Sequence, residues 1–454
     1  MMGPEFRRNL WLELTTRRIV FMVGILALVF FAAAVSGPSY TPYSAAETIY
    51  YLIAVIWGAR NAGLSIVGEI RDHTWDLQRL SSISASEMIW GKLFGSTIYN
   101  WFGGAICLAV MLVYGFTHGT PVSAILDLIY YVIVGLVAQA SALLASLIAI
   151  RRRSAHSRLD VFLYQFAGIA AALAVFYLWQ AADPASAILL GKKSTDVINW
   201  WGAVISARPF LLISLALFTA WLLTGCYREM RRELKMRNGP LVWLGFLTFM
   251  GIYVAGFDAW LPHNSNLPQW SIVALRLALA TTAYGVLTYV MVLLEPKDRV
   301  LYRWYGSQIA SGAVGPAFWN LQAWLMSYAA MVIVALALIW WLFAQHAGAA
   351  YSALTFAGLG FLTRDVSIFV FFAATRRRGD FAAIVTLIAL YALIPAILDG
   401  LGVKAALPLF YPTPSNPVWL GPAIVWGEAV AAVIAAISRV ALAGKRVPSA
   451  SLRS

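Results

Sequence analysis

Apolar and polar residues alternate in long blocks along this chain. Twelve apolar runs hold about 20 residues each, which is enough for a helix to cross the hydrocarbon core of a bilayer. The runs lie near 19–36, 46–67, 94–116, 122–150, 160–182, 209–227, 240–260, 271–294, 317–344, 351–374, 381–399 and 421–443. This pattern predicts an all-α polytopic membrane protein with twelve transmembrane helices.

The composition supports this prediction. Hydrophobic residues make up 61% of the 454 residues, charged residues only 12%, and the mean hydropathy is +0.75. A soluble domain is far less apolar than this. The formal net charge of +13 does not indicate a nucleic-acid partner, because the basic residues are spread between the apolar runs. The two cysteines, Cys107 and Cys226, lie within or at the end of such runs, so we expect no disulfide framework.

Basic residues also give the expected sidedness. With alternating spans and the N-terminus inside, 26 of the 33 Lys and Arg residues fall on the cytoplasmic side. Only Lys192, Lys193, Arg208 and Lys404 fall on the outer side. A wrong span count would destroy this asymmetry. We therefore expect both termini to be cytoplasmic, in a multi-pass protein of the bacterial inner membrane.

Two short motifs recur at nearly equal offsets. EIRD at 69–72 is similar to EPKD at 295–298, and RRR at 151–153 recurs at 376–378. Each pair falls at the same place in the predicted topology, which indicates a 6+6 internal repeat. We expect residues 1–227 to form the first six-span half, 228–239 a basic cytoplasmic linker and 240–454 the second half. In each half, a partly apolar outer segment before the last span is either a re-entrant hairpin or an interfacial loop.

The connection at 68–93, after the second run, is unusually polar. Ser84 and Glu87 have the spacing of a capping box, in which each side chain binds the backbone N–H of the other residue. A helix should therefore begin at Ala85 and continue into the third span. The preceding part interleaves polar residues with Trp75, Leu77, Leu80 and Ile83. This pattern predicts an amphipathic helix near 69–83 on the cytoplasmic membrane surface, and a plain loop is the alternative.

The same connection resembles the signature of type-two ABC exporter permeases. The residues that carry the resemblance are, in order, Glu69, Thr74, Leu80, Ile83, Ser84, Glu87, Gly91, Lys92 and Leu93. The resemblance implies six spans per half, a coupling helix that contacts a separate ATPase, and re-entrant helices before the sixth span. The coupling residues expected in this half are Glu69, Arg71, Asp72, Asp76, Arg79, Ser84, Glu87 and Lys92.

The second half departs from that signature. The EPKD motif is followed by RVLYRWYGSQIASGAVGPAFWN, which has no matching Thr, Glu or Gly-Lys. We expect a degenerate coupling segment near 295–312, and the two halves to bind the partner asymmetrically. Its candidate contacts are Glu295, Lys297, Asp298 and Arg303.

Four ionisable residues within predicted spans are candidates for a translocation path, because charge in a membrane is costly and commonly functional. They are Arg60, Arg364, Asp365 and Glu428. The alternative is that Arg60 or Arg364 pairs with a carboxylate on another helix and fixes the packing. Arg364 and Asp365 are adjacent, and neighbours on a helix point about 100° apart, so we expect them to be poor partners for each other.

No G-x-x-x-x-G-K-[ST] motif occurs, so ATP and Mg²⁺ are expected in a partner chain and this chain is not expected to be an enzyme. The five histidines show no zinc-site spacing. We expect the permease subunit of an ATP-driven ABC exporter, surrounded by lipid and bound to two ATPase subunits. One copy per transporter is expected, and a homodimer stays open. An amphipathic or lipid-like substrate is typical of the family.

The alternative function is an ion-coupled secondary transporter of the major-facilitator kind, which also has 6+6 spans. That family carries a Gly-x-x-x-Asp-Arg-x-Gly-Arg loop between its second and third spans. Here the loop begins similarly at Gly68 and Asp72, but His73 replaces the first Arg and no Gly-Arg follows. This departure favours the ABC permease.

Overall fold

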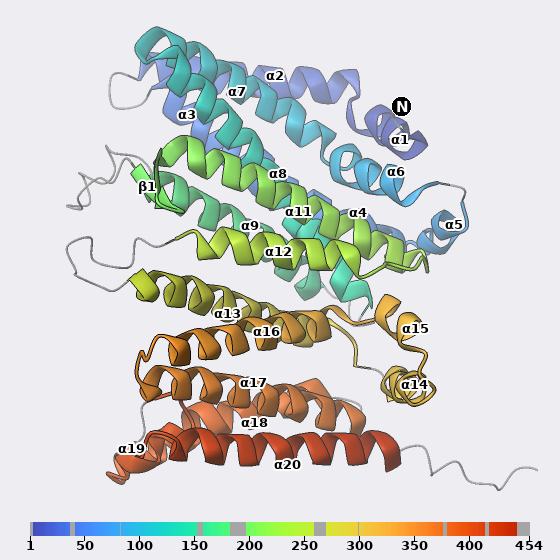
Figure 1. The fold of residues 1–454 in the computed structure, drawn as a ribbon. Coiled ribbons are helices and arrows are strands. Elements are labelled where there is room, and N and C mark those ends of the chain that lie inside the picture. Colours follow the sequence, from blue (N-terminus) through green and yellow to red (C-terminus); the bar gives the residue numbers. More distant parts are fainter. Residues whose placement is uncertain are drawn as a thin grey trace, which may run out of the picture. The chain divides into compact units, whose positions relative to one another are not determined.

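The computed structural model describes residues 3–36, 41–81, 83–151, 158–181, 197–257, 269–297, 299–375, 379–413 and 417–442. Nearly all of them are helical (Figure 1), and eleven of their helices are long and apolar enough to cross a membrane. The chain is thus an all-α, multi-pass membrane protein, as predicted. It divides into two compact units, each described by itself. Unit 1 is Met1–Ile198 with Val204–Asn238, and unit 2 is Asn199–Ala203 with Gly239–Ser454.

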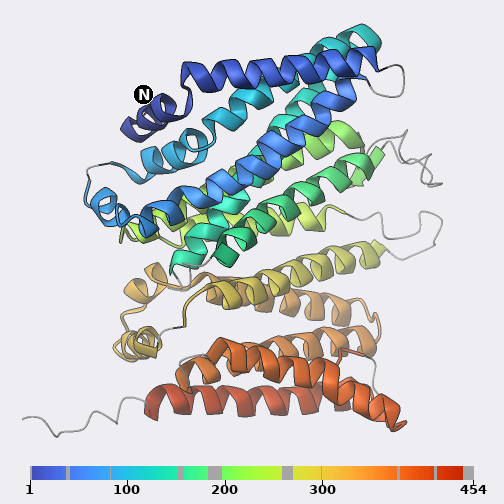
Figure 2. The same ribbon diagram turned by 180° about the vertical axis from the view of Figure 1, so that it is seen from behind.

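Unit 1 begins with a short helix and continues with long apolar ones. Its helices are α1 Pro4–Glu13, α2 Thr16–Val35, α3 Pro42–Tyr50, the π-helical η1 Tyr51–Trp57, α4 Gly58–Arg71, α5 Trp75–Arg79, α6 Ala85–Trp90, the π-helical η2 Gly91–Gly95, α7 Ile98–His118, α8 Pro121–Arg151, α9 Arg158–Ala181 and α11 Ala207–Glu233. Within the unit, α1, α5 and α6 lie at one end of the bundle. Figure 2 shows the same end from behind, with α1 in dark blue beside the light-blue α5 and α6.

Two polar side chains inside unit 1 donate hydrogen bonds to backbone carbonyls of the π-helical segment η1. A π-helical turn disturbs the regular backbone ladder and leaves carbonyls in need of other donors. Asn100 Nδ2 donates to the carbonyl of Ile53 at 2.9 Å, and Gln139 Nε2 donates to that of Ala54 at 2.9 Å. The two amides therefore satisfy backbone groups that lipid would leave unpaired.

A separate hydrophobic core lies where α6 packs against α8 and α11. We call it the α6 core, and Trp75, Met88, Leu143, Leu147 and Met230 belong to it. All five are buried, four of them completely. The burial of Trp75 anchors the short helix α5 to the end of the bundle.

Unit 2 is also helical in nearly all of its described residues. Its helices are α12 Leu241–Ala255, α13 Gln269–Leu294, α14 Arg299–Ala310, α15 Val314–Trp319, α16 Ala323–Ala344, α17 Ala349–Thr375, α18 Gly379–Ile388, the π-helical η3 Ala389–Leu393, α19 Ile394–Gly400, the 3₁₀ helix η4 Lys404–Leu409 and α20 Leu420–Leu442. Within this unit, α14 and α15 lie at one end and α19 at the other (Figures 1 and 2).

The predicted twelve spans compare with eleven qualifying helices among the described residues. The difference is the run near 240–260, where α12 has only 15 residues. A helix of that length is short of the roughly 20 residues needed to cross the hydrocarbon core. Residues 258–268, which follow α12, lie outside the described residues. The 6+6 repeat stays a prediction.

Only part of each outer segment lies among the described residues, so the choice between a re-entrant hairpin and an interfacial loop stays a prediction. Before α11, the described residues form a hairpin of two strands, β1 Val197–Trp200 and β2 Ala203–Ser206. Trp201 and Gly202 both have positive φ, as a two-residue hairpin turn requires. β-Branched residues in both strands favour the extended backbone. In unit 2, the described part of the segment before α20 contains η4 instead of a long helix.

Candidate functional site

The connection between α4 and α6 is built differently from the expected amphipathic helix. α4 ends at Arg71, and the backbone then turns at His73, whose φ of 58° is left-handed. A residue in this region cannot continue a right-handed helix. The helix predicted over 69–83 is therefore wrong in its extent. Glu69 lies in the last turn of α4, and only Trp75–Arg79 forms the surface helix α5.

The predicted capping box is confirmed at the start of α6. The Glu87 N–H donates to Ser84 Oγ at 3.3 Å, and the Ser84 N–H donates to Glu87 Oε2 at 3.1 Å. The Ser84 hydroxyl also donates to Glu87 Oε2 at 2.8 Å. The bonds that Ser84 donates lower the pKa of the Glu87 carboxyl below its ordinary value, and the bond from the hydroxyl has a larger effect than the bond from the N–H. Both side chains are thus engaged in starting the helix.

Lys92, one turn further, lies at the centre of a buried polar group. Its side chain is only 2% exposed, and its ammonium is paired with Glu69 and lies 2.6 Å from Glu5 Oε1. Lys92 also donates to Gln78 Oε1 at 3.0 Å, and Gln78 Nε2 donates to Glu69 Oε1 at 2.5 Å. We call these four residues the Lys92 cluster. It joins α1, α4, α5 and η2, so the side chain of Lys92 is directed into the protein.

Two glycines allow α1 to approach the Lys92 cluster. A Cβ at Gly91 would lie 3.0 Å from side-chain carbons of Glu5, and one at Gly95 would lie 2.8 Å from Asn9 Nδ2. Gly91 and Gly95 are one helical turn apart and therefore share a face. The sequence reading missed Glu5 and Gln78. A lysine at the start of an apolar span needs a carboxylate partner when it is buried. This requirement could have directed a search of the sequence toward Glu5.

Outside the Lys92 cluster, the turn and α5 present side chains to solvent. Arg71 and Asp72 are exposed, and the Asp76 side chain is 87% exposed with Arg79 3.5 Å away. The apolar residues Leu77 and Leu80 are 71% and 85% exposed. We define the α5 face as Arg71, Asp72, Asp76, Leu77 and Leu80. Exposed apolar side chains rimmed by charges are typical of a surface that binds another protein.

The corresponding connection of unit 2 holds its charged residues in other ways. Glu295 is 3% exposed and accepts the backbone N–H of Trp324 at 3.2 Å, in the first turn of α16. Lys297 Nζ donates to Asp380 Oδ1 at 2.7 Å, and the side chain of Lys297 is 2% exposed. Asp298 lies outside the described residues.

The helix α14 occupies most of the predicted degenerate segment near 295–312. With 12 residues it is longer than α5, and it places Arg303 at the surface. Val300 and Ile309 are 71% and 66% exposed. Tyr305 is buried and donates to the carbonyl of Asn320 at 2.6 Å, and this burial raises the pKa of Tyr305 to about 12.

Charged residues inside the spans of unit 2 form a connected group. Arg364 Nη1 donates to Glu428 Oε2 at 2.8 Å, which joins α17 to α20. Asp365 accepts from the hydroxyls of Tyr289 at 2.7 Å and Tyr391 at 2.6 Å. Arg364 Nε also donates to Asp365 Oδ1 at 3.1 Å. The expectation that these neighbours are poor partners is therefore wrong, because the guanidinium of Arg364 reaches the carboxylates of both Asp365 and Glu428.

The charges within the spans were expected either to line a translocation path or to pair between helices. Pairing between helices accounts for Arg364. Arg60 differs, because it is exposed on α4 and forms no hydrogen bond or ion pair with the described residues. Glu428 is paired and still 41% exposed through its side chain. Exposure of a carboxylate in a candidate span leaves it accessible to a mobile ion or ligand.

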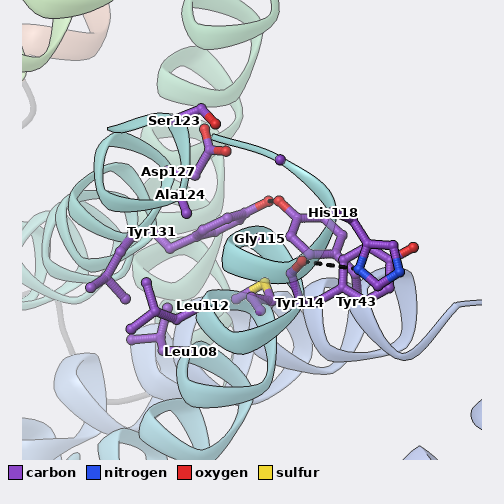
Figure 3. A pocket seen from close by; sticks show the side chains of 13 residues that line it. Tyr43, Leu108, Leu112, Tyr114, Gly115, His118, Ser123, Ala124, Asp127 and Tyr131 are labelled. Atoms are coloured by element: carbon purple, nitrogen blue, oxygen red, sulfur yellow. Dashed lines mark hydrogen bonds between the residues drawn. The ribbon is translucent and has the colours of Figure 1, made fainter. Parts of the chain in front are cut away.

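A small pocket lies at the opposite end of unit 1 from α5, where α7 and α8 meet α3 (Figure 3). Its volume is about 210 Å³. The Tyr43 and Tyr131 hydroxyls are 3.4 Å apart, and the His118 ring stacks on Tyr114 with centroids separated by 4.1 Å. Tyr131 also donates to Glu47 Oε1 at 2.8 Å. Most polar groups of this pocket thus engage one another, which is typical of a packed aromatic cap.

No family model matches this chain, and no curated protein or solved structure matches it either. Among the described residues, no group of His, Cys, Asp and Glu side chains is arranged to hold a metal ion. Function is therefore inferred from the sequence pattern and from the geometry of the two connections.

Proposed function

We propose that this chain is the transmembrane permease subunit of an ATP-driven ABC exporter, bound to two separate ATPase subunits. The observation that carries the proposal is the α5 face, an exposed mixed surface fixed to two spans by buried groups. In this proposal, the end of unit 1 that bears α5 faces the cytoplasm of a bacterium. ATP and Mg²⁺ belong to the ATPase, and the cargo is amphipathic or lipid-like.

The Lys92 cluster gives the α5 face a rigid connection to the membrane helices. Glu69 ends the second candidate span, Lys92 precedes the third, and Glu5 belongs to α1. Breaking a buried ion pair costs about 3–5 kcal/mol, so a displacement of α5 is expected to move these elements together. ATPase closure would then rock the helices between two states. In this role Glu69 and Lys92 transmit force, and the exposed residues make the contact.

Unit 2 offers a second, different contact through α14. This helix presents Arg303, Val300 and Ile309 instead of the acidic side chains of the α5 face. Because the two surfaces differ in charge, two identical ATPase subunits would bind them unequally. The proposal therefore includes an asymmetric complex in which α5 provides the tighter contact.

The test is co-purification with an ATPase subunit, which is sought first among the products of the neighbouring genes. Leu80→Asp places a charge on the α5 face, and Leu401→Asp is a matched control because Leu401 is also strongly exposed, at 71%. We expect Leu80→Asp to lose the ATPase and the substrate-stimulated ATP hydrolysis, and Leu401→Asp to keep both. Equal behaviour of the two variants, or a wild-type protein that binds no ATPase, would contradict the proposal.

A second candidate function, an ion-coupled secondary transporter, is favoured by one observation. The group formed by Arg364, Asp365 and Glu428 is the kind of intramembrane charge that couples transport to an ion gradient. Proteoliposomes that contain only this chain distinguish the two candidates. Substrate uptake driven by a proton gradient without ATP, and abolished by Glu428→Gln, would favour the secondary transporter.

A further inference from the structure

A large apolar cavity, partly open at the surface of unit 2, is bounded by α14, α15, α16, α17 and α20. Its volume is about 670 Å³, within the roughly 300–1,000 Å³ typical of ligand pockets. Leu325, Val366, Val370, Val433 and Ala436 are among the residues that line it. We call it the α14 cavity.

The same region of unit 1 is filled by protein. There α6 packs against α8 and α11 through the α6 core, in which Met88, Leu143, Leu147 and Met230 are completely buried. The two units therefore differ at this end: side chains fill the space beside α6 in unit 1, and the space beside α14 in unit 2 stays open.

Most polar groups in the wall of the α14 cavity are already engaged, and the Tyr302 hydroxyl is an exception because it is buried with no hydrogen-bond partner among the described residues. Tyr305 donates to a backbone carbonyl, Tyr328 and Thr363 share a hydrogen bond of 2.7 Å, and Ser367 donates to the carbonyl of Thr363 at 2.7 Å. Arg303 on α14 contributes the charged group among the lining residues, and it is exposed. An occupant should therefore have an apolar body and a negatively charged end.

The position of the α14 cavity indicates where such an occupant comes from. α16 contributes its beginning, and α20 contributes Val433 to Ala441 near its end, about 12 Å of helix. Both are candidate spans, so these ends lie where acyl chains and headgroups of one leaflet meet. A phospholipid supplies both required parts, and basic residues at this level attract anionic headgroups.

We propose that the α14 cavity binds an acyl chain of an anionic phospholipid from the adjoining leaflet, with the phosphate group paired to Arg303. The lipid then supports α14 in the way that the α6 core supports the corresponding end of unit 1. Removal of the lipid leaves an apolar cavity exposed beneath α14. This proposal does not depend on whether the chain acts with an ATPase.

The test measures lipid bound to the delipidated full-length protein by native mass spectrometry, with phosphatidylglycerol and phosphatidylcholine as probes. Ala436→Phe places a ring in the cavity, and we expect binding of both lipids to fall at least about tenfold. Arg303→Gln should lower phosphatidylglycerol affinity about fivefold and leave phosphatidylcholine unchanged. Arg299→Gln is the matched control, because Arg299 is exposed on the same helix and does not line the cavity.

Two results would overturn the proposal. One is that Ala436→Phe, shown by its melting curve to be folded, binds both lipids as the wild-type protein does. The other is that Arg299→Gln and Arg303→Gln reduce phosphatidylglycerol binding equally, which would indicate attraction to the basic surface only. If Ala436→Phe does not fold, Val433→Phe fills the same space, and the arginine pair decides in either case.

Discussion

The two connections that follow the second long helix of each unit hold a carboxylate in different ways. In unit 1, Glu69 pairs with the side chain of Lys92. In unit 2, Glu295 accepts the backbone N–H of Trp324 at the start of α16. Both contacts connect the end of one candidate span to the segment that begins the next candidate span. The first uses a side-chain cation, and the second uses the positive end of a helix.

This difference accounts for what surrounds each carboxylate. Lys92 carries a full charge into a nearly dry site, so further polar groups must surround it, and Glu5 and Gln78 do so from α1 and α5. Those elements close over the bundle and complete a packed end. The contact between Glu295 and Trp324 fixes the start of α16, and α14 lines the α14 cavity. The packing beside the two joints therefore differs, with a filled core in unit 1 and the α14 cavity in unit 2.

The largest expected effect comes from removing the ammonium group of Lys92 in unit 1. Lys92→Met removes the buried cation between Glu5 and Glu69 and leaves their carboxylates the longer ion pairs with the exposed Arg8, at 3.9 and 3.3 Å. We expect a loss of about 3–5 kcal/mol in the free energy of unfolding. Equilibrium unfolding in mixed micelles measures this loss. The triple variant with Glu5→Gln and Glu69→Gln should recover most of it, because no uncompensated charge remains. Failure of that recovery would show that Lys92 acts through packing alone.

A smaller effect is expected at the corresponding place in unit 2. Glu295→Ala removes the acceptor of the Trp324 N–H, and an unsatisfied buried donor of this kind costs about 1.5–3 kcal/mol. Glu295→Gln keeps a carbonyl acceptor and should cost clearly less in the same unfolding measurement. If the two substitutions cost the same, the charge of Glu295, and not the cap of α16, holds this joint.

The sequence predicts the parts of these connections that depend on neighbouring residues. The capping box follows from the spacing of Ser84 and Glu87, and the apolar runs follow from composition. The extent of the surface helix does not follow, because the left-handed turn at His73 is not encoded by hydrophobic periodicity. Short-range patterns carry information about helix starts, and much less about where a helix stops.

Contacts between distant segments were the main features that the sequence did not reveal. Glu5 and Lys92 are separated by the whole of the first two spans, and nothing in their local patterns pairs them. The α14 cavity is likewise a property of how five helices pack. The intramembrane group of Arg364, Asp365 and Glu428 was predictable as a set of costly charges, and its pairing required the structure.

The cap of α6 provides a test of intermediate size. Ser84→Ala removes the hydroxyl that accepts the N–H of Glu87, and loss of an N-terminal cap costs about 1 kcal/mol. Thermal unfolding should show a modest decrease in melting temperature. Ser84→Asp retains a capping oxygen and should restore most of the loss. A Ser84→Ala protein with an unchanged melting temperature would indicate that the α6 core alone holds α6 in place.

The smallest expected effect is a pH dependence that arises at the capping box of unit 1. The hydrogen bonds from Ser84 lower the pKa of Glu87 below its ordinary value of 4.5 in the folded protein. A lowered folded pKa means that the carboxylate adds stability above the unfolded pKa, and that this contribution is lost as the pH falls through the folded value. Melting curves of the wild-type protein and Glu87→Gln should therefore differ near neutral pH and converge in acid. Asp76→Asn is a suitable control, because the side chain of Asp76 is 87% exposed. Curves that instead converge as the pH rises would mean that the folded protein favours the protonated form of Glu87, and the capping box would then not be the source of its stability.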